Sequence, residues 1–354
     1  MNRLHVIIPA GGVGSRLWPL SRKDRPKFLL DLRMSGKSLL QETIDRLAPI
    51  AASFTIVTGR AHEQAVRAQI PQGLDVTVLV EPQGRDSMPA IGLAAYVIRQ
   101  RFGEEALIAS FAADHAITHP QVLLDCVERA LEVAQKGYVV TIGLRPLTPS
   151  TAYGYIAPGE PFEKESPEKG SIVRSFVEKP DEETAKHYCE QGYLWNAGMF
   201  IMTAGTLARA LTRFHPDMDT HLSVIGSQWE SEDFAKTLSE EWPALTKIAI
   251  DHAIAEPLAS EGGVAVVPAT DMGWTDVGDF DALAQISSEG QALRIDSPDS
   301  FVRSLTGQKI VLVGAPNMAV IATEDAILVV DRNRAQDVKH VVDQLTQSGE
   351  DELL

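Results

Sequence analysis

The segment "IIPAGGVGSRLWPLSRKDRPKFLL" (residues 7–30) contains the strongest pattern in this chain. An apolar run ends at a cluster of glycines, and basic side chains follow within a few residues. Glycines after a strand allow backbone N–H groups to approach a phosphate closely. Two permanent cations, Arg16 and Lys27, accompany this bare backbone and suit a triphosphate. The segment therefore predicts a strand followed by an anion-binding loop.

Two well-known phosphate-binding motifs do not fit this loop. A dinucleotide-binding fingerprint that begins at Gly12 would need a glycine at position 17, where the chain has Leu17. A Walker A loop would need Gly-Lys-Ser/Thr after four spacer residues, and the sequence has no such run. A tight turn that binds no ligand is the alternative explanation of the glycines.

Apolar runs alternate with amphipathic stretches through the first 145 residues. We expect strands near residues 4–8, 54–58, 76–80, 106–111 and 138–143, and helices near residues 38–48, 61–69, 89–102 and 121–135. This alternation predicts an α/β fold with a mainly parallel sheet. Because ligands in such folds bind at the carboxyl ends of the strands, the glycine loop and "AADH" (112–115) are expected to lie together.

The rest of the chain departs from this alternation. Within residues 150–200, "STAYGYIAPGE" and "SIVRSFVEKP" resemble strands that Gly and Pro interrupt. After a polar, turn-rich stretch at 286–300, the sequence predicts three short strands within 309–333 and an amphipathic helix at 334–345. We therefore expect a first domain of residues 1–285 and a small C-terminal segment of residues 286–354.

The composition narrows the class of protein. The 354 residues are 44% hydrophobic and carry a formal net charge of −16, whereas nucleic-acid binding requires a basic face. No apolar run approaches the length of a membrane span, and no secretory signal begins the chain. Cys126 and Cys189 have no metal-binding spacing. We expect a cytoplasmic protein that binds neither nucleic acid nor membranes.

Eight motifs, in order along the chain, resemble those of the sugar-nucleotide pyrophosphorylases, in particular their mannose-1-phosphate guanylyltransferase branch. They are the segment quoted above, "EPQGRDSMPAIGLAA" (81–95), "FAADHAI" (111–117), "TIGLRPLTPSTAYGYI" (141–156), "FVEKP" (176–180), "YLWNAGMF" (193–200), "KIAIDHAIAE" (247–256) and "GWTDVGDF" (273–280). The resemblance covers nearly the whole chain. It implies a GT-A or Rossmann-like nucleotidyltransferase domain with a mixed, mainly parallel sheet, and a small C-terminal segment like a left-handed β-helix that ends in a helix.

The resemblance also implies a reaction and roles for individual residues. GMP would pass from GTP to α-D-mannose 1-phosphate, giving GDP-mannose and pyrophosphate. The nucleotide site would contain Gly11, Gly12, Gly14, Ser15, Arg85, Asp86, Pro89 and Ala113. The sugar-phosphate site would contain Gly154, Glu178, Lys179 and Asn196. Arg16, Lys27 and Lys179 would be the catalytic cations, and Asp114 and Asp276 would hold Mg²⁺. Arg22, Lys23 and Arg25 are expected to be solvated charges.

Two interpretations of Asp86 remain open at this point. It lies in "RDSMPA" (85–90), where the family more commonly has asparagine. Its carboxylate could accept hydrogen bonds from guanine N1–H and N2–H₂, while Arg85 serves O6 and backbone carbonyls near Pro89 accept from the base. Asp86 could equally cap the helix that follows, because Asp is a preferred N-cap residue.

The implied chemistry explains why these residue types are needed. The attacking phosphate oxygen is already anionic at pH 7, so the protein must align two mutually repelling anions and stabilise the leaving pyrophosphate. One rival interpretation is a pyrophosphorylase for another base or hexose. Another is a non-catalytic sugar-nucleotide sensor, which should have lost one of the cations or metal-binding carboxylates. The hydrophobic strands at 310–330 could pair with a second subunit, since exposed strand edges invite pairing.

Overall fold

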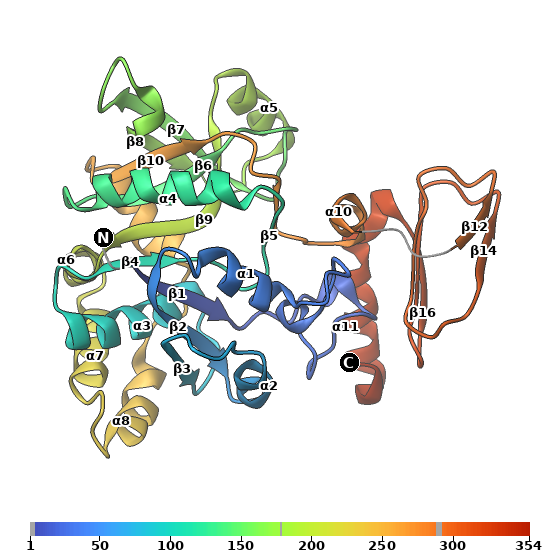
Figure 1. Cartoon of the computed structure of the whole chain (residues 1–354), viewed down its shortest axis with the longest axis horizontal. Helices are drawn as coiled ribbons and strands as arrows, with labels where there is room; N and C mark the ends of the chain where they lie inside the picture. Colours follow the sequence, from blue (N-terminus) through green and yellow to red (C-terminus); the bar gives the residue numbers. More distant parts are fainter. Residues whose placement is uncertain (1–3, 178, 288–291) are drawn as a thin grey trace.

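The computed structural model describes residues 4–177, 179–287 and 292–354. The strands of its main sheet are β1 (Leu4–Ala10), β2 (Ala51–Gly59), β3 (Val76–Glu81), β4 (Leu107–Ser110), β6 (Val139–Leu144), β7 (Gly154–Pro161), β8 (Ser171–Val177), β9 (Leu194–Thr203) and β10 (Val264–Ala269). They lie in the order β3-β2-β1-β4-β9-β6-β10-β8-β7 (Figure 1). Each strand expected in the first 145 residues overlaps one of these.

The sheet contains both parallel and antiparallel strand pairs, but most of its strands run in the same direction. Within it, β8 and β9 run one way and the other seven strands run the opposite way. The reversed strand β9 lies between β4 and β6 and is antiparallel to both. The carboxyl ends of β1, β3 and β4 therefore share one edge, where a ligand is expected.

Helices cover both faces of this sheet, as is usual in the α/β fold that the alternating sequence predicted. α3 (Ser87–Phe102), α6 (Ala204–Phe214) and α7 (Pro216–Ser227) pack on one face, and α1 (Leu39–Leu47) and α4 (Pro120–Ala134) pack on the other. Further helices are α2 (Glu63–Ala68), α5 (Glu182–Glu190), α8 (Phe234–Glu241), α9 (Glu256–Ala259), α10 (Phe280–Ile286) and α11 (Val338–Ser348). None of the helices in the described ranges combines the length and apolarity that a bilayer span requires.

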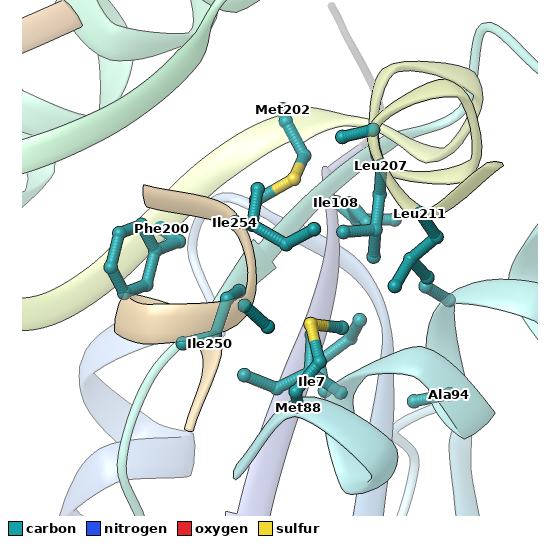
Figure 2. Close-up of a cluster of buried hydrophobic side chains, with 14 of the residues drawn as sticks. Ile7, Met88, Ala94, Ile108, Phe200, Met202, Leu207, Leu211, Ile250 and Ile254 are labelled. Atoms are coloured by element: carbon teal, nitrogen blue, oxygen red, sulfur yellow. The ribbon is translucent and has the colours of Figure 1, made fainter. Parts of the chain in front are cut away.

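The alternation of side chains along β1 shows how the two cores arise. Ile7 belongs to the core beneath α3 and α6, whereas Val6 and Ile8 belong to the core beneath α1 and α4. Successive side chains of a strand point to opposite faces, so a strand covered on both sides reads as a continuous apolar run. Figure 2 shows the first of these cores, in which Ile7 and Met88 lie among side chains from several elements.

The C-terminal segment forms a coil of short strands. They are β12 (Ala292–Ile295), β13 (Phe301–Ser304), β14 (Ile310–Val313), β15 (Met318–Ala322) and β16 (Ile327–Asp331). β12 pairs in parallel with β14 and β13 with β15, and both ladders join residues 18 positions apart. The three strands and the helix expected in this part of the chain are therefore confirmed.

The corners of this coil repeat with the same spacing. Asp296 and Gly314 both have a positive φ, and so do Asp299 and Asn317. Gly, Asn and Asp are the residues that adopt this left-handed conformation most readily. The chain therefore turns in the same way once per coil, which gives the expected β-helix-like shape.

A third buried cluster joins the C-terminal unit to the loop that follows β1. Leu17 and Trp18 from that loop pack with Val277, which precedes α10, and with Phe301 and Val338 from the C-terminal unit. Figure 1 shows α11 between the N-terminal loops and the small β unit. The two parts of the chain thus share one core at this point.

Arg22 contributes to the same junction, and the expectation that it is a solvated charge is wrong. Its side chain is 11% exposed, and its guanidinium forms an ion pair with Asp325 at 2.8 Å. It also donates a hydrogen bond to the carbonyl of Leu353 and lies over the Trp18 ring. The neighbouring Lys23 side chain is mostly exposed, as expected.

Candidate active site

The glycine loop folds back onto Lys27. Gly14 has a φ of 76°, and a Cβ on it would lie 2.6 Å from the Cβ of Lys27, so only glycine fits there. The backbone N–H of Lys27 donates to the carbonyl of Val13 at 3.0 Å. Gly11 and Gly12 are exposed, and Ser15 lies half-buried in the short 3₁₀ helix that follows. The loop therefore presents bare backbone directly above a buried lysine.

A two-stranded ladder brings the two predicted metal ligands to this loop. β5 (Ala116–Ile117) pairs antiparallel with β11 (Trp274–Thr275), and Thr275 lies opposite Ala116. Asp276 follows Thr275, and Asp114 lies two residues before Ala116, so both aspartates emerge at the same end of the ladder. Residues from separate motifs are brought together by this pairing.

Lys27 contacts both aspartates. Its Nζ lies 2.7 Å from Asp114 Oδ2 and donates to the backbone carbonyl of Asp276 at 2.5 Å. Burial opposes ionisation of Asp114, but the Lys27 ammonium, His115 and hydrogen bonds together outweigh it and hold the pKa of this carboxyl below its usual range. In this state the lysine and Asp114 neutralise each other.

Tyr153 and Arg16 surround the carboxylate of Asp276. The Tyr153 hydroxyl donates to Asp276 Oδ1 at 3.0 Å. Burial, with Asp276 adding to it, raises the pKa of Tyr153, so the hydroxyl keeps its proton. A Cβ on Gly278 would lie 2.9 Å from Asp276 Oδ2 and 3.4 Å from Arg16 Nη1, which places the guanidinium on the same side of the site. Tyr153 is a contact that the sequence did not predict.

These residues fit a magnesium ion that is held by two carboxylates. Among the described residues, no group of three or more His, Cys, Asp and Glu side chains is arranged to hold a metal. Mg²⁺ commonly takes only one or two protein carboxylates and fills its other positions with phosphate oxygens and water. His115 is committed elsewhere, because its Nδ1 accepts from Trp274 Nε1 at 3.2 Å and burial lowers its pKa.

The predicted base loop is held by its own contacts. Arg85 Nη1 donates to the carbonyl of Leu245 at 2.5 Å. Asp86 is the exposed N-cap of α3, and its Oδ1 accepts from Ser87 N at 2.7 Å, which is the contact of the capping alternative. Pro89 is buried in the first turn of α3, where carbonyls accept hydrogen bonds within the helix, so a backbone contact from there to guanine lacks geometric support. A guanine contact by Asp86 stays a prediction.

Asn196 is engaged inside the protein. Its Nδ2 donates to Asp251 Oδ1 at 2.7 Å, and its Oδ1 accepts from Thr141 Oγ1 at 3.1 Å. Gly154 lies opposite Asn196 in the ladder between β7 and β9. The amide that was predicted to meet sugar hydroxyls therefore already has partners, and its direct contact with a sugar stays a prediction.

The other predicted residues differ in how they are placed. Lys179 is exposed directly after β8, with a φ of 47°. Ala113 is buried beside Asp114. Glu178, predicted to contact the sugar, lies outside the described residues.

Sequence reasoning missed Glu81, the last residue of β3. It is 7% exposed, and its Oε2 has no hydrogen-bond partner among the described residues. Its Oε1 lies 3.4 Å from where a Cβ on Gly11 would be. The available signal was an acidic residue that ends the apolar strand "VTVLV" at the ligand-binding edge.

We expect Glu81→Gln to change how stability depends on pH. Burial raises the pKa of Glu81 from 4.5 to about 7, so between these pH values the unfolded chain loses a proton that the folded chain keeps. Rising pH therefore lowers the free energy of unfolding of the unliganded wild type, by at most about 3 kcal/mol, and glutamine abolishes this term. Urea unfolding of both proteins at pH 5 and pH 8 measures it. An equal difference between the two proteins at both pH values would contradict the expectation.

The sequence families that match this chain agree with the geometry. The family described as nucleotidyl transferase matches residues 5–292. The family described as MannoseP isomerase/GMP-like beta-helix domain matches residues 290–345. Together with the glycine loop, the cations and the paired aspartates, the first match defines the class of protein as a nucleotidyl transferase.

Similarity over the full chain narrows this class. A mannose-1-phosphate guanylyltransferase of Escherichia coli (strain K12) is 35% identical and covers 99% of this chain and 75% of its own length. The xanthan biosynthesis protein XanB of Xanthomonas campestris pv. campestris (strain B100) is 34% identical, with the same two coverages. A crystal structure titled mannose-1-phosphate geranyltransferase, from Thermus thermophilus, superposes with a TM-score of 0.82 at 31% identity, over 98% of this chain and 100% of that one. The chain belongs to the mannose-1-phosphate guanylyltransferase family.

Proposed function

We propose that this protein transfers GMP from GTP to α-D-mannose 1-phosphate and releases pyrophosphate. The observation that carries the proposal is the meeting of Lys27, Asp114 and Asp276 beneath the glycine loop. It is supported by guanylyltransferase relatives that match the chain over almost its whole length. A sensor that has lost its catalytic groups is not favoured, because the cations and both aspartates are present and close together.

The proposed reaction is an in-line displacement at phosphorus. An anionic oxygen of mannose 1-phosphate attacks the α-phosphorus of GTP, and the bond from that phosphorus to the oxygen bridging to the β-phosphate breaks. No proton has to be removed from the attacking group. The backbone of the glycine loop would orient the triphosphate, while Arg16 and Lys27 would offset the charge that develops on the leaving pyrophosphate.

We also propose Mg²⁺ as the cofactor, with Asp114 and Asp276 as the residues that would hold it. When bound, Mg²⁺ supplies positive charge between phosphate groups that otherwise repel each other. The ammonium of Lys27 already lies against the Asp114 carboxylate and the backbone carbonyl of Asp276, which supports a position for positive charge there.

Pyrophosphate release with GTP and mannose 1-phosphate tests the proposal. The same assay with ATP, UTP and CTP, and with glucose 1-phosphate, separates this function from the rival pyrophosphorylases. The expected result is that GTP with mannose 1-phosphate gives the highest kcat/KM and that EDTA stops the reaction. A higher kcat/KM for any other pair would replace the proposed substrates.

The C-terminal unit supports a homodimer and a separate role in assembly. Seven of the eleven exposed large apolar side chains among the described residues lie in it, namely Leu293, Ile295, Leu305, Val311, Val313, Ile327 and Val329. Exposed apolar side chains that are concentrated in one part of a protein commonly mark an interface. We also propose a division between the two parts after residue 285, in the last turn of α10 (Phe280–Ile286). Sedimentation equilibrium tests the dimer, and a purely monomeric protein would contradict it.

A cytoplasmic location is also proposed. Cys126 and Cys189 are both free, which fits a reducing compartment. The net charge of −16 opposes binding to nucleic acid and to anionic membranes, whereas the basic residues within 16–27 suit a small anionic substrate.

We expect Lys179→Ala to damage the use of mannose 1-phosphate selectively. Lys179 follows β8 in a separate segment of the chain from Arg16 and Lys27, and its ammonium is proposed to meet the incoming phosphate. Loss of one charge-assisted contact should raise the KM for mannose 1-phosphate roughly 10- to 100-fold while changing the KM for GTP less than about twofold. Lys186→Ala, an exposed lysine on α5, is the matched control. An equal rise in both KM values would refute this role.

A further inference from the structure

Glu81 is the group that the transfer chemistry leaves unexplained. The residue is 7% exposed, and its Oε2 is buried without a hydrogen-bond partner in the part of the chain that the structure describes. A buried carboxyl without a partner is costly and rare in folded proteins. Burial also raises the pKa of Glu81 to about 7. An unsatisfied acid kept at the ligand-binding edge of a sheet indicates a group whose partner arrives with the ligand.

The surroundings of Glu81 indicate which ligand this is. Its Oε1 lies 3.4 Å from the position of a Cβ on Gly11 and 4.0 Å from that of a Cβ on Gly84. Gly11 belongs to the loop that is proposed to hold the triphosphate, and Gly84 precedes α3 in the predicted base loop. Neither position carries a side chain that could cover the carboxyl. Glu81 therefore lies where the two proposed nucleotide-binding segments meet.

We propose that Glu81 selects guanine by accepting hydrogen bonds from the N1–H and the exocyclic N2 amino group of the base. The proposal rests on the proposed function for the identity of the nucleotide. The two oxygens of a carboxylate match two parallel donors, as they do in carboxylate–guanidinium pairs. Adenine presents an unprotonated N1 at this edge, and two acceptors facing each other repel. The base thus supplies the donors that the protein does not.

Asp86, the other carboxylate near the base loop, is less suited to this task. It is exposed, and its Oδ1 already accepts from Ser87 N. A hydrogen bond from water can satisfy an exposed carboxylate, so discrimination between bases at such a position is weak. A buried, unsatisfied acceptor discriminates strongly, because a base that lacks the matching donors leaves it unpaired.

Equilibrium binding tests the proposal without requiring turnover. Isothermal titration calorimetry with GTP, ITP and ATP, in the presence of Mg²⁺ and without sugar phosphate, gives the Kd of each nucleotide. ITP keeps N1–H but lacks the N2 amino group. Wild type should bind GTP about 10- to 100-fold more tightly than ITP, the range expected for a bidentate contact to a base. Glu81→Gln should reduce this ratio to about threefold or less, because the amide NH₂ meets the N2 amino group as donor against donor.

Asp75→Asn, which changes an exposed carboxylate just before β3, is the matched control and should keep the wild-type ratio of GTP to ITP affinity; Asp86→Asn is measured beside it. The proposal is overturned if wild type binds GTP and ITP equally, an outcome that needs no variant to fold. It is also overturned if Glu81→Gln keeps the ratio, and a loss of the ratio in Asp86→Asn alone would transfer base selection to that residue. A wild type that binds GTP selectively but forms no GDP-mannose would refute the proposed function while the role of Glu81 stands.

Discussion

Asp114→Asn is expected to lower kcat by about 10³-fold, an effect that saturating GTP and mannose 1-phosphate do not reverse. The substitution removes a charge that is proposed to hold Mg²⁺ against the phosphates and that faces Lys27 at 2.7 Å in the unliganded protein. An amide oxygen is a weaker ligand for a hard cation than a carboxylate. The same loss is expected for Asp276→Asn, because both aspartates emerge at one end of the β5–β11 ladder.

Two nearby aspartates provide controls for this measurement. Asp271 Oδ1 accepts from Gly273 N at 2.8 Å, and Asp279 caps α10 through Asp281 N at 2.9 Å. Asp271→Asn should therefore leave kcat within about threefold of wild type, since this residue only closes a turn. Circular dichroism and the melting temperature check that each variant folds. Near-normal turnover of Asp114→Asn or Asp276→Asn at limiting Mg²⁺ would eliminate the two-aspartate site.

Lys27→Met is expected to reduce kcat/KM by about 10³-fold, similar in size to the loss of an essential oxyanion donor. Methionine keeps most of the volume of the buried side chain and removes its charge. Without the ammonium, one of the two cations proposed to neutralise the β- and γ-phosphates is missing. Steady-state kinetics with GTP measure the effect, and Lys23→Met, which removes an exposed lysine on the same loop, should stay within about twofold of wild type.

Lys27→Met should also change metal binding in the absence of nucleotide. In the unliganded protein the ammonium contacts the Asp114 carboxylate, which is one of the two proposed metal ligands, so it competes with a cation for this carboxylate. Removing it should tighten the binding of Mn²⁺ alone at least about tenfold, measured by electron paramagnetic resonance. Unchanged or weaker Mn²⁺ binding would show that the lysine and the metal occupy different places.

The sequence predicted the positions of the strands well but not the contacts between distant residues. Strand β1 is an apolar run followed by glycines, and such a local pattern is sufficient to predict a strand. The ladder of β5 and β11 has two residues on each side and joins segments about 160 residues apart, so no local periodicity could reveal it. The motifs named Asp114 and Asp276 as a pair, and this short ladder is what brings them together.

The sequence did not reveal contacts in which a residue meets a partner from a distant part of the chain. Arg22 resembled a solvated charge because its neighbours in the chain are polar, yet Asp325 and Leu353 enclose it. Asn196 resembled a sugar ligand because its motif is characteristic, and no local pattern indicates that its amide donates to Asp251. Glu81 could not be recognised from the sequence, because one acidic residue after an apolar strand is common. Only its burial in the folded protein distinguishes it.

The core shared by the glycine-loop region and the C-terminal coil has a consequence for how the molecule unfolds. Leu17 adjoins Arg16, Val277 adjoins Asp276, and both are buried with Phe301 and Val338 in a single cluster. If either side of this cluster lost its partner, apolar surface next to Arg16 and Asp276 would be exposed. The chain should therefore melt in one cooperative calorimetric transition, although two sequence families meet near residue 290. A fragment cut at that junction would lose Phe301 and Val338 from the cluster and would expose Leu17 in the loop that follows β1.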